Sequence, residues 1–319
     1  MADLLAEIGK NLADRWLTLL VLPGALFLAV LATARTLGQA HAFDVQRLVH
    51  QVSAWAALST VHSTAALAVI LVAVLLGSAA AGVAAQAVGS MIENIWLAAG
   101  WRTWPAPLRQ IAGRRLRRRQ LRWREAQASY QNKRDEAGRA LALSRIRSRT
   151  PAQQVPLDDL TAAYECLARI SREYPGRPMW IGDRIEAVTV RLDREYRLDL
   201  ATVWPSLWLA MPQDTRADIT TSRQSLTTAT ALAGWGILYL VPGVLWWPAL
   251  VVAAGTVFAG YRRARIAADA YALILDAAAR LHSCDLARQL GIEHTGPLDQ
   301  DTGWALTRQL QGQPESRIV

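Results

Sequence analysis

The sequence predicts an all-α integral membrane protein, with two pairs of transmembrane helices and a mostly helical cytoplasmic domain between them. Of its 319 residues, 52% are hydrophobic and only 19% are charged, below the roughly 25% typical of soluble domains. The apolar residues gather in three long uncharged runs. The net charge of +9 is concentrated between these runs. This composition excludes a disordered chain, and the presence of only two cysteines excludes a disulfide scaffold.

The first two uncharged runs predict the first transmembrane pair, 16–90. A bilayer core about 30 Å thick needs about 20 apolar residues in a helix, which predicts one span at about 16–36 and another at 64–86. The connection between them, 37–63, is expected to be an extracytoplasmic loop. The preceding residues, 1–15, are expected to form a cytoplasmic helix.

Small residues line the second predicted span. Ser78 and Gly82, like Ala81 and Ala85, are separated by four residues. Such pairs let two helix backbones approach closely in lipid. The surface that they form can pack against another helix of the same chain or against a second copy, so the sequence leaves a homo-oligomer open.

The third uncharged run is too long for one span and predicts a transmembrane hairpin, 225–261. Val241-Pro242-Gly243 divides this run, so Leu226–Leu240 is expected to run one way and Val244–Gly260 to return. Two alternatives remain open, because the pair can cross the bilayer fully or be re-entrant. Both alternatives give the same topology.

The distribution of Lys and Arg predicts the orientation. The segment 91–224 holds 24 of them and the segment 262–319 holds seven, whereas the hairpin turn holds none. The positive-inside rule therefore places both termini and the segment 91–224 on the cytoplasmic side of the cell membrane. The segment 262–319 is expected to be a helical tail, with Gly291 stopping its helix.

A basic helical arm is predicted at the start of the cytoplasmic segment. Nine arginines and no acidic residue lie between Asn94 and Arg124, and no proline interrupts 106–148 after Pro107. A basic stretch beside a membrane attracts anionic lipid headgroups. An acidic protein partner and a merely solvated helix face are the alternatives, and no recognised motif points to nucleic acid. The candidate lipid- or partner-binding residues are Arg114, Arg115, Arg117, Arg118, Arg119, Arg122, Trp123 and Arg124.

Short helices are expected after the arm. The spacing of apolar residues predicts a helix over Leu157–Leu167, and Tyr174–Pro178 is expected to break it. Asp183 stands three residues before Glu186, the spacing of a capping box, which predicts the start of the next helix. A further helical face suits either a membrane surface or the core of the cytoplasmic unit: Trp204, Leu207, Trp208 and Met211.

Three short stretches followed by the hydrophobic hairpin resemble a group of uncharacterised bacterial membrane proteins. The stretches are Pro178-Met179-Trp180-Ile181-Gly182-Asp183, Tyr196-Arg197-Leu198-Asp199 and Trp204-Pro205-Ser206-Leu207. The group has Thr, Asn, Gly and Arg where this chain has Met179, Asp183, Arg197 and Ser206. The resemblance implies a polytopic inner-membrane protein with about four spans, and it carries no activity with it. The motif residues of candidate functional importance are Gly182, Asp183, Arg184, Tyr196, Asp199, Trp204 and Pro205.

The sequence contains no motif for a nucleotide, a metal or another cofactor, so no cofactor is expected. No acid or arginine lies in the middle of a predicted span, which argues against a proton-coupled transporter. We therefore expect a membrane-anchored interaction or scaffold protein, whose cytoplasmic helical platform at the inner leaflet binds a protein partner. The alternatives are an oligomeric channel or transporter and a membrane-bound enzyme with a site near Asp183–Asp199, of which the sequence does not favour the enzyme.

Overall fold

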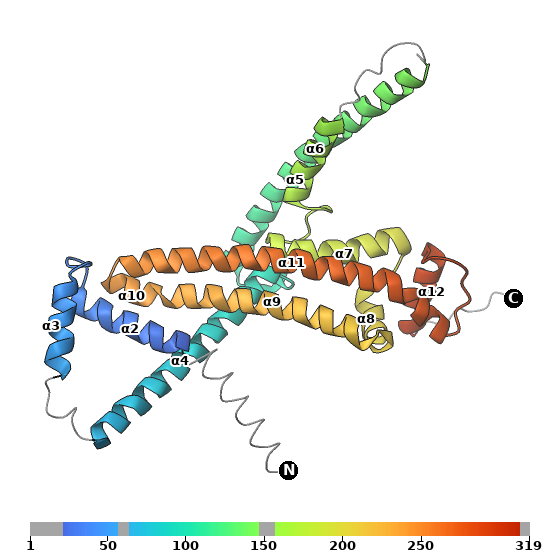
Figure 1. Ribbon diagram of the computed structural model, residues 1–319. Coiled ribbons are helices and arrows are strands. Elements are labelled where there is room, and N and C mark those ends of the chain that lie inside the picture. The colour runs from blue at the N-terminus through green and yellow to red at the C-terminus, as the bar shows by residue number, and fades with distance from the viewer. Residues whose placement is uncertain (1–21, 57–63, 147–156, 313–319) are drawn as a thin grey trace, which may run out of the picture. The chain divides into compact units, whose positions relative to one another are not determined.

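The computed structural model describes residues 22–56, 64–146 and 157–312, and every regular element in these ranges is a helix (Figure 1). The all-α prediction is therefore confirmed for the described chain. The elements are α2 (Leu22–Leu37), α3 (Val45–Ala56), α4 (Thr64–Leu97), η3 (Trp101–Thr103), α5 (Ala106–Ile146), α6 (Leu157–Ile170), α7 (Trp180–Tyr196), α8 (Leu200–Ala210), α9 (Gln213–Leu238), α10 (Leu240–Leu245), α11 (Pro248–Gln289) and α12 (Gln300–Leu310).

The chain forms two compact units, and each unit is built from two separate stretches of sequence. Unit 1 comprises Met1–Glu93 and Ser225–Ala264. Unit 2 comprises Asn94–Gln224 and Arg265–Val319. The helices α4, α9 and α11 contribute residues to both units.

Two segments of the described chain are long and apolar enough to cross a membrane, Ala65–Leu97 and Gln213–Leu245. The predicted span 64–86 is thus the first part of a longer helix. The helix α2, with 16 described residues, is a shorter apolar helix, and the start of the predicted span 16–36 lies outside the described residues, as does the predicted helix 1–15.

The small-residue surface of α4 packs inside unit 1. A Cβ atom on Gly24 of α2 would lie 2.2 Å from the carbonyl oxygen of Ser78, and one on Gly234 of α9 would lie 2.4 Å from that of Ala85. Gly82 is also buried, and Ala81 packs against the cluster around Phe27. Of the two alternatives for this surface, the structure therefore shows packing against helices of the same chain.

The hairpin reverses later than the sequence predicts. Pro242 and Gly243 are buried within α10 instead of dividing the run, and the backbone becomes extended only at Trp246. Proline in a first helical turn loses no intrahelical hydrogen bond, so α10 continues through it. Pro248 then begins α11, and the returning helix packs closely, because a Cβ on Gly260 would lie 2.9 Å from the Ala233 nitrogen.

The predicted extracytoplasmic loop, 37–63, contains the helix α3, which the prediction missed. The corner between α2 and α3 holds the end of the hairpin. The Gln39 side chain donates a hydrogen bond to the Val244 carbonyl at 2.7 Å, and the Trp246 indole donates one to the Ala42 carbonyl at 2.9 Å. Two side-chain hydrogen bonds therefore join the α2–α3 corner to the end of the hairpin.

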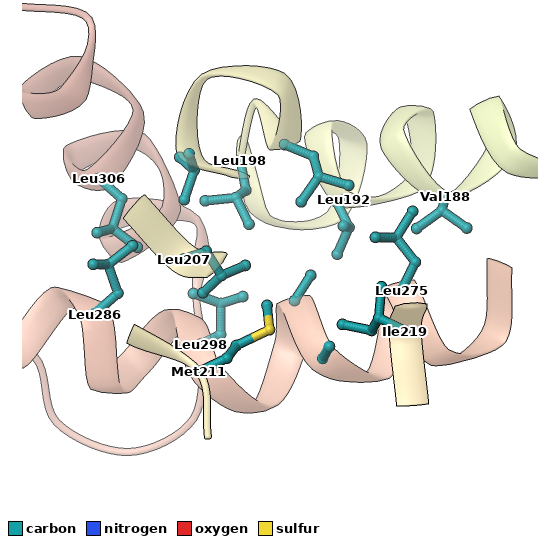
Figure 2. Packing of buried hydrophobic residues seen from close by; sticks show 14 of the residues in the cluster. Val188, Leu192, Leu198, Leu207, Met211, Ile219, Leu275, Leu286, Leu298 and Leu306 are labelled. Atoms are coloured by element: carbon teal, nitrogen blue, oxygen red, sulfur yellow. The ribbon is translucent and has the colours of Figure 1, made fainter. Parts of the chain in front are cut away.

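Unit 2 has a hydrophobic core of its own, to which α7, α8, α9, α11 and α12 contribute (Figure 2). Leu192, Leu198, Leu207 and Leu306 are fully buried there. Met211 is also buried, while Trp204 and Trp208 are partly buried against the same cluster. The helical face predicted over 204–211 is thus part of the core, and the alternative of a membrane surface does not hold for Leu207 and Met211.

The arm of unit 2 consists of α5 and α6, which pack along one another (Figure 1). The predicted helix 106–148 is confirmed over its described part, and so is the break over 174–178. The second part of α11 forms the first part of the segment 262–319, which the sequence predicts to be a helical tail. Gly291 takes a φ of +73° after α11, and its N–H donates to the Arg288 carbonyl, as a glycine that ends a helix does.

Candidate interaction site on the basic arm

The arginine cluster of α5 has two faces, of which one packs inside unit 2 and the other is exposed. The inner face contacts the segment that joins α6 to α7. Three of its side chains donate hydrogen bonds to main-chain carbonyls: Arg119 to Arg177 (2.8 Å) and Ile170 (2.8 Å), Gln120 to Pro175 (2.9 Å) and Trp123 to Ser171 (3.1 Å). Arg119 and Trp123 were candidates for binding a lipid or partner. Their polar groups are instead engaged inside unit 2.

Asp183 is the hub of this junction. Its buried carboxylate accepts four hydrogen bonds, from Arg119 Nη2 (3.0 Å), Ser171 Oγ (2.5 Å), Gly176 N (2.8 Å) and Arg177 N (3.2 Å). A buried carboxylate is tolerated when it is paired and fully hydrogen-bonded, and breaking such a pair is costly. Asp183 therefore joins the arm, the connecting segment and α7.

The predicted helix start at Asp183 is wrong. The helix α7 begins at Trp180, and its N-cap residue, Met179, makes no side-chain capping hydrogen bond. The capping-box spacing misled because the Asp183 carboxylate binds the N–H groups of Gly176 and Arg177 rather than those of its own first turn.

The opposite face of α5 is exposed. We call it the outer face and define it by residues that share one side of the helix at 100° per residue: Ile111, Arg114, Arg115, Arg118, Leu121 and Arg122. Arg117 is exposed beside it. Within the described ranges, these five arginines make no ion pair. Arg124 does not belong to the outer face. Its guanidinium donates a hydrogen bond to the Tyr174 hydroxyl at 3.0 Å and lies over the Tyr174 ring.

Gly182 and Arg184 fix the beginning of α7. A Cβ on Gly182 would lie 1.9 Å from the carbonyl oxygen of Leu97, so a larger residue would push the two segments apart. The buried Arg184 side chain donates from Nε to Asp269 Oδ1 at 2.5 Å. Both motif residues therefore position helices.

The remaining motif residues lie where α7 ends and α8 begins. The Tyr196 hydroxyl accepts a hydrogen bond from Arg280 at 3.1 Å. Asp199 is the N-cap of α8 and accepts from the Ala201 N–H at 3.1 Å. Trp204 pairs with Trp208, with ring centroids 5.8 Å apart, and Pro205 is exposed within α8. The carboxylates of Asp183 and Asp199 thus both have structural roles, although one alternative expected a catalytic site between them.

A ladder of ion pairs between α7 and α11 was missed by the sequence prediction. It joins residues of constant separation along two parallel stretches of helix: Arg184 to Asp269 (2.5 Å), Arg191 to Asp276 (3.7 Å) and Glu195 to Arg280 (3.0 Å). The signal was present, because each helix carries its three charges at spacings of seven and four residues. Only the pairing of the two helices was unknown.

Candidate metal ligands and cysteine thiols are scattered over the part of the chain that the structure describes. No group of three or more His, Cys, Asp or Glu side chains there could hold a metal ion. Cys166 is exposed and Cys284 is partly buried, and burial raises the pKa of the Cys284 thiol, which disfavours the reactive thiolate.

No protein-family model, curated protein or solved structure matches this chain.

Proposed function

We propose that this chain is an integral membrane protein that presents unit 2 as a helical platform on the cytoplasmic side of the membrane. The observation that carries the proposal is the bare apolar surface of α4. In the most apolar stretch of Ala65–Leu97, only 11% of the residues are buried. The exposed side chains lie on all sides of this helix: Leu67, Val69, Ile70, Leu71, Val72, Val74, Leu75 and Leu76.

A helix that is hydrophobic all round belongs in a protein core or in a membrane. The rest of the described chain does not cover this part of α4, so no protein core surrounds it. Removing a Val, Leu or Ile side chain from water is favourable by about 1.5–3 kcal/mol. For eight half-exposed side chains this amounts to on the order of 10 kcal/mol, which supports lipid as the environment of α4.

The hairpin supports the same environment less strongly, because the apolar stretch of Gln213–Leu245 is 44% buried. An exposed apolar groove follows its returning helix, lined among others by Leu250, Val257 and Phe258. With α2 and the start of α11, these helices make up the proposed two membrane pairs. The bias of Lys and Arg supports a cytoplasmic location for the termini and unit 2.

The outer face of α5 is the proposed contact with anionic lipid headgroups of the inner leaflet. Near such a surface each Arg contributes about 1 kcal/mol, so the four arginines of the outer face contribute on the order of 4 kcal/mol at low salt. Ile111 and Leu121 are exposed among them and can enter the headgroup region. Unit 2, which has its own core, is then available to a cytoplasmic protein partner.

Extraction of membranes tests the anchor. The full-length protein should stay in the membrane pellet after washing with carbonate at high pH and with concentrated salt. Protease added outside intact cells should leave the 110–220 region uncut. Release by either wash, or cleavage there from outside, would refute the anchored topology.

A fluorescent reporter tests the outer face. Leu121→Cys, made with Cys166→Ser and Cys284→Ser, is labelled with a polarity-sensitive dye in nanodiscs of phosphatidylcholine with or without phosphatidylglycerol. We expect a blue shift only with the anionic lipid, reversed by salt. Arg118→Gln/Arg122→Gln should abolish the shift. Arg134→Gln/Arg139→Gln, exposed arginines further along α5, is the matched control and should retain it.

The same variants separate lipid from protein as the ligand. A stoichiometric partner that is purified with the wild type and with the control, but not with Arg118→Gln/Arg122→Gln, would assign the outer face to a protein. Point variants are used because deleting 150–216 would remove much of the unit 2 core, including Leu192 and Leu207. No blue shift and no such partner would refute the assigned role of the outer face.

A further inference from the structure

Within unit 2, α11 carries a second exposed surface that the proposed function does not use. Ile266, Leu273 and Leu281 are 67%, 62% and 70% exposed. The exposed Ala270 and Ala277 lie between them. The spacings of four, three, four and four residues place all five on one side of the helix. We call these five residues the α11 stripe, which is about 22 Å long.

The stripe is not expected to face lipid. Under the proposed topology Arg262, Arg263 and Arg265 lie at the cytoplasmic membrane surface, and the stripe follows them. Charged residues of α11, among them Asp269 and Arg280, also run along one of its edges. Three large apolar side chains aligned on one water-exposed helix face mark an interaction surface.

We infer that the α11 stripe binds the same stripe of a second copy of this chain, in a parallel pair of helices related by a two-fold axis. This inference rests on the proposed function, because α11 begins in the membrane hairpin. All copies in one bilayer then run α11 in the same direction, and their stripes lie at the same height above the membrane.

The composition of the stripe fits such a pair. Large side chains alternate with alanine, so two helices can approach closely at Ala270 and Ala277 while the larger residues fill the space between them. The surface that could otherwise have mediated self-association, around Ser78 and Ala85 of α4, is already covered within the chain.

The charged residues along the two edges of the stripe also fit a parallel two-fold pair. Arg280, which pairs with Glu195 of its own chain, lies on one edge, and Asp285, which pairs with Arg288 of its own chain, lies on the other. Both side chains are still partly exposed, at 35% and 49%. In a parallel two-fold pair, opposite edges of the two helices face each other. Arg280 of one copy therefore approaches the partner's Asp285, on each side of the pair.

Disulfide trapping in native membranes tests the pairing. Ala270→Cys and Ala277→Cys are each made in the full chain with Cys166→Ser and Cys284→Ser. Ala217→Cys, an exposed alanine on α9, is the matched control. Mild oxidation should give linked dimers at positions 270 and 277, since a parallel pair brings identical positions together, and little at position 217. Equal linking at all three positions would indicate random collision and overturn the inference.

The mass of the purified protein in mild detergent gives the second measurement. Leu273→Glu should raise the dissociation constant of the dimer by on the order of a hundredfold or more, because it places two carboxylates in the interface. Leu209→Glu, on an even more exposed leucine of α8, should leave the dimer intact. A monomeric wild type, or equal dissociation by both variants, would overturn the pairing.

The two proposals fail in distinguishable ways. A chain released by carbonate refutes the membrane anchor. A chain that is retained in the pellet but never linked at 270 or 277 refutes only the pairing.

Discussion

The junction centred on Asp183 gives the sharpest stability prediction. In Asp183→Asn, the amide oxygen can still accept from the N–H groups of Gly176 and Arg177. The amide nitrogen then replaces the oxygen that accepts from Arg119 at 3.0 Å and from Ser171 at 2.5 Å. The substitution therefore keeps the shape of the junction and removes its ion pair.

The expected loss of unfolding free energy in Asp183→Asn depends on the burial of Arg119, whose side chain is only 14% exposed. Removing one partner of a buried pair costs about 3–5 kcal/mol. Arg119 keeps its hydrogen bonds to two main-chain carbonyls, which places the expected loss near the lower end, at about 3 kcal/mol.

The assay is thermal unfolding of the full-length protein in detergent, with amide hydrogen exchange to locate the opening. Exchange should rise first over 170–183, where the arm meets α7. The matched control is Asp159→Asn, which removes an exposed pair with Lys133 on the same arm and should cost less than about 1 kcal/mol.

A double-mutant cycle isolates the pair itself. Arg119→Met combined with Asp183→Asn should be less destabilised than the sum of the two single variants, because the double variant leaves no unpaired buried charge. If Asp183→Asn costs no more than Asp159→Asn, or if the two effects simply add, the carboxylate does not hold the junction in the way described.

Three further predictions concern single positions in unit 2. Arg197 ends α7 at a φ of +50°, where a non-glycine residue costs about 1–2 kcal/mol. Arg197→Gly should therefore stabilise the protein by about 0.5–1 kcal/mol in thermal unfolding after the entropy of glycine is deducted, whereas Arg197→Ala should not. Cys284, whose thiol pKa burial raises, should be alkylated more slowly than the exposed Cys166 at pH 8, and equal rates by mass spectrometry would contradict this. Hydrogen bonds from Thr302 lower the pKa of Asp299, the N-cap of α12, so its contribution is present above the unfolded pKa and lost as pH falls. Exchange protection of α12 should therefore decrease below about pH 4, and Asp299→Ala should remove that dependence.

The sequence was sufficient for features that depend on local pattern. The uninterrupted composition of 106–148 predicts α5, and the apolar spacing after Leu157 predicts α6. Gly291 predicts the end of α11, because a glycine at that position satisfies the last carbonyls of a helix. Each of these features depends on residues within a few turns of one another.

The same sequence could not show which side of a helix meets which neighbour. Arg119 and Arg118 are adjacent and chemically identical, yet one binds Asp183 and the other is exposed. The difference depends on the segment 170–177, more than 50 residues away. The ladder between α7 and α11 was hidden for the same reason, since 85 residues separate Arg184 from Asp269.

The division of the chain into two interleaved units has a consequence for biosynthesis. Unit 1 needs Ser225–Ala264 to cover the small residues of α4, and unit 2 needs Arg265–Val319 to complete its core. Neither unit can therefore finish folding until the ribosome has made most of the chain, and contacts between distant residues form slowly. Until then, the small-residue surface of α4 stays uncovered. Truncation between residues 225 and 264 would leave both units incomplete, so premature termination there should yield no independently stable fragment.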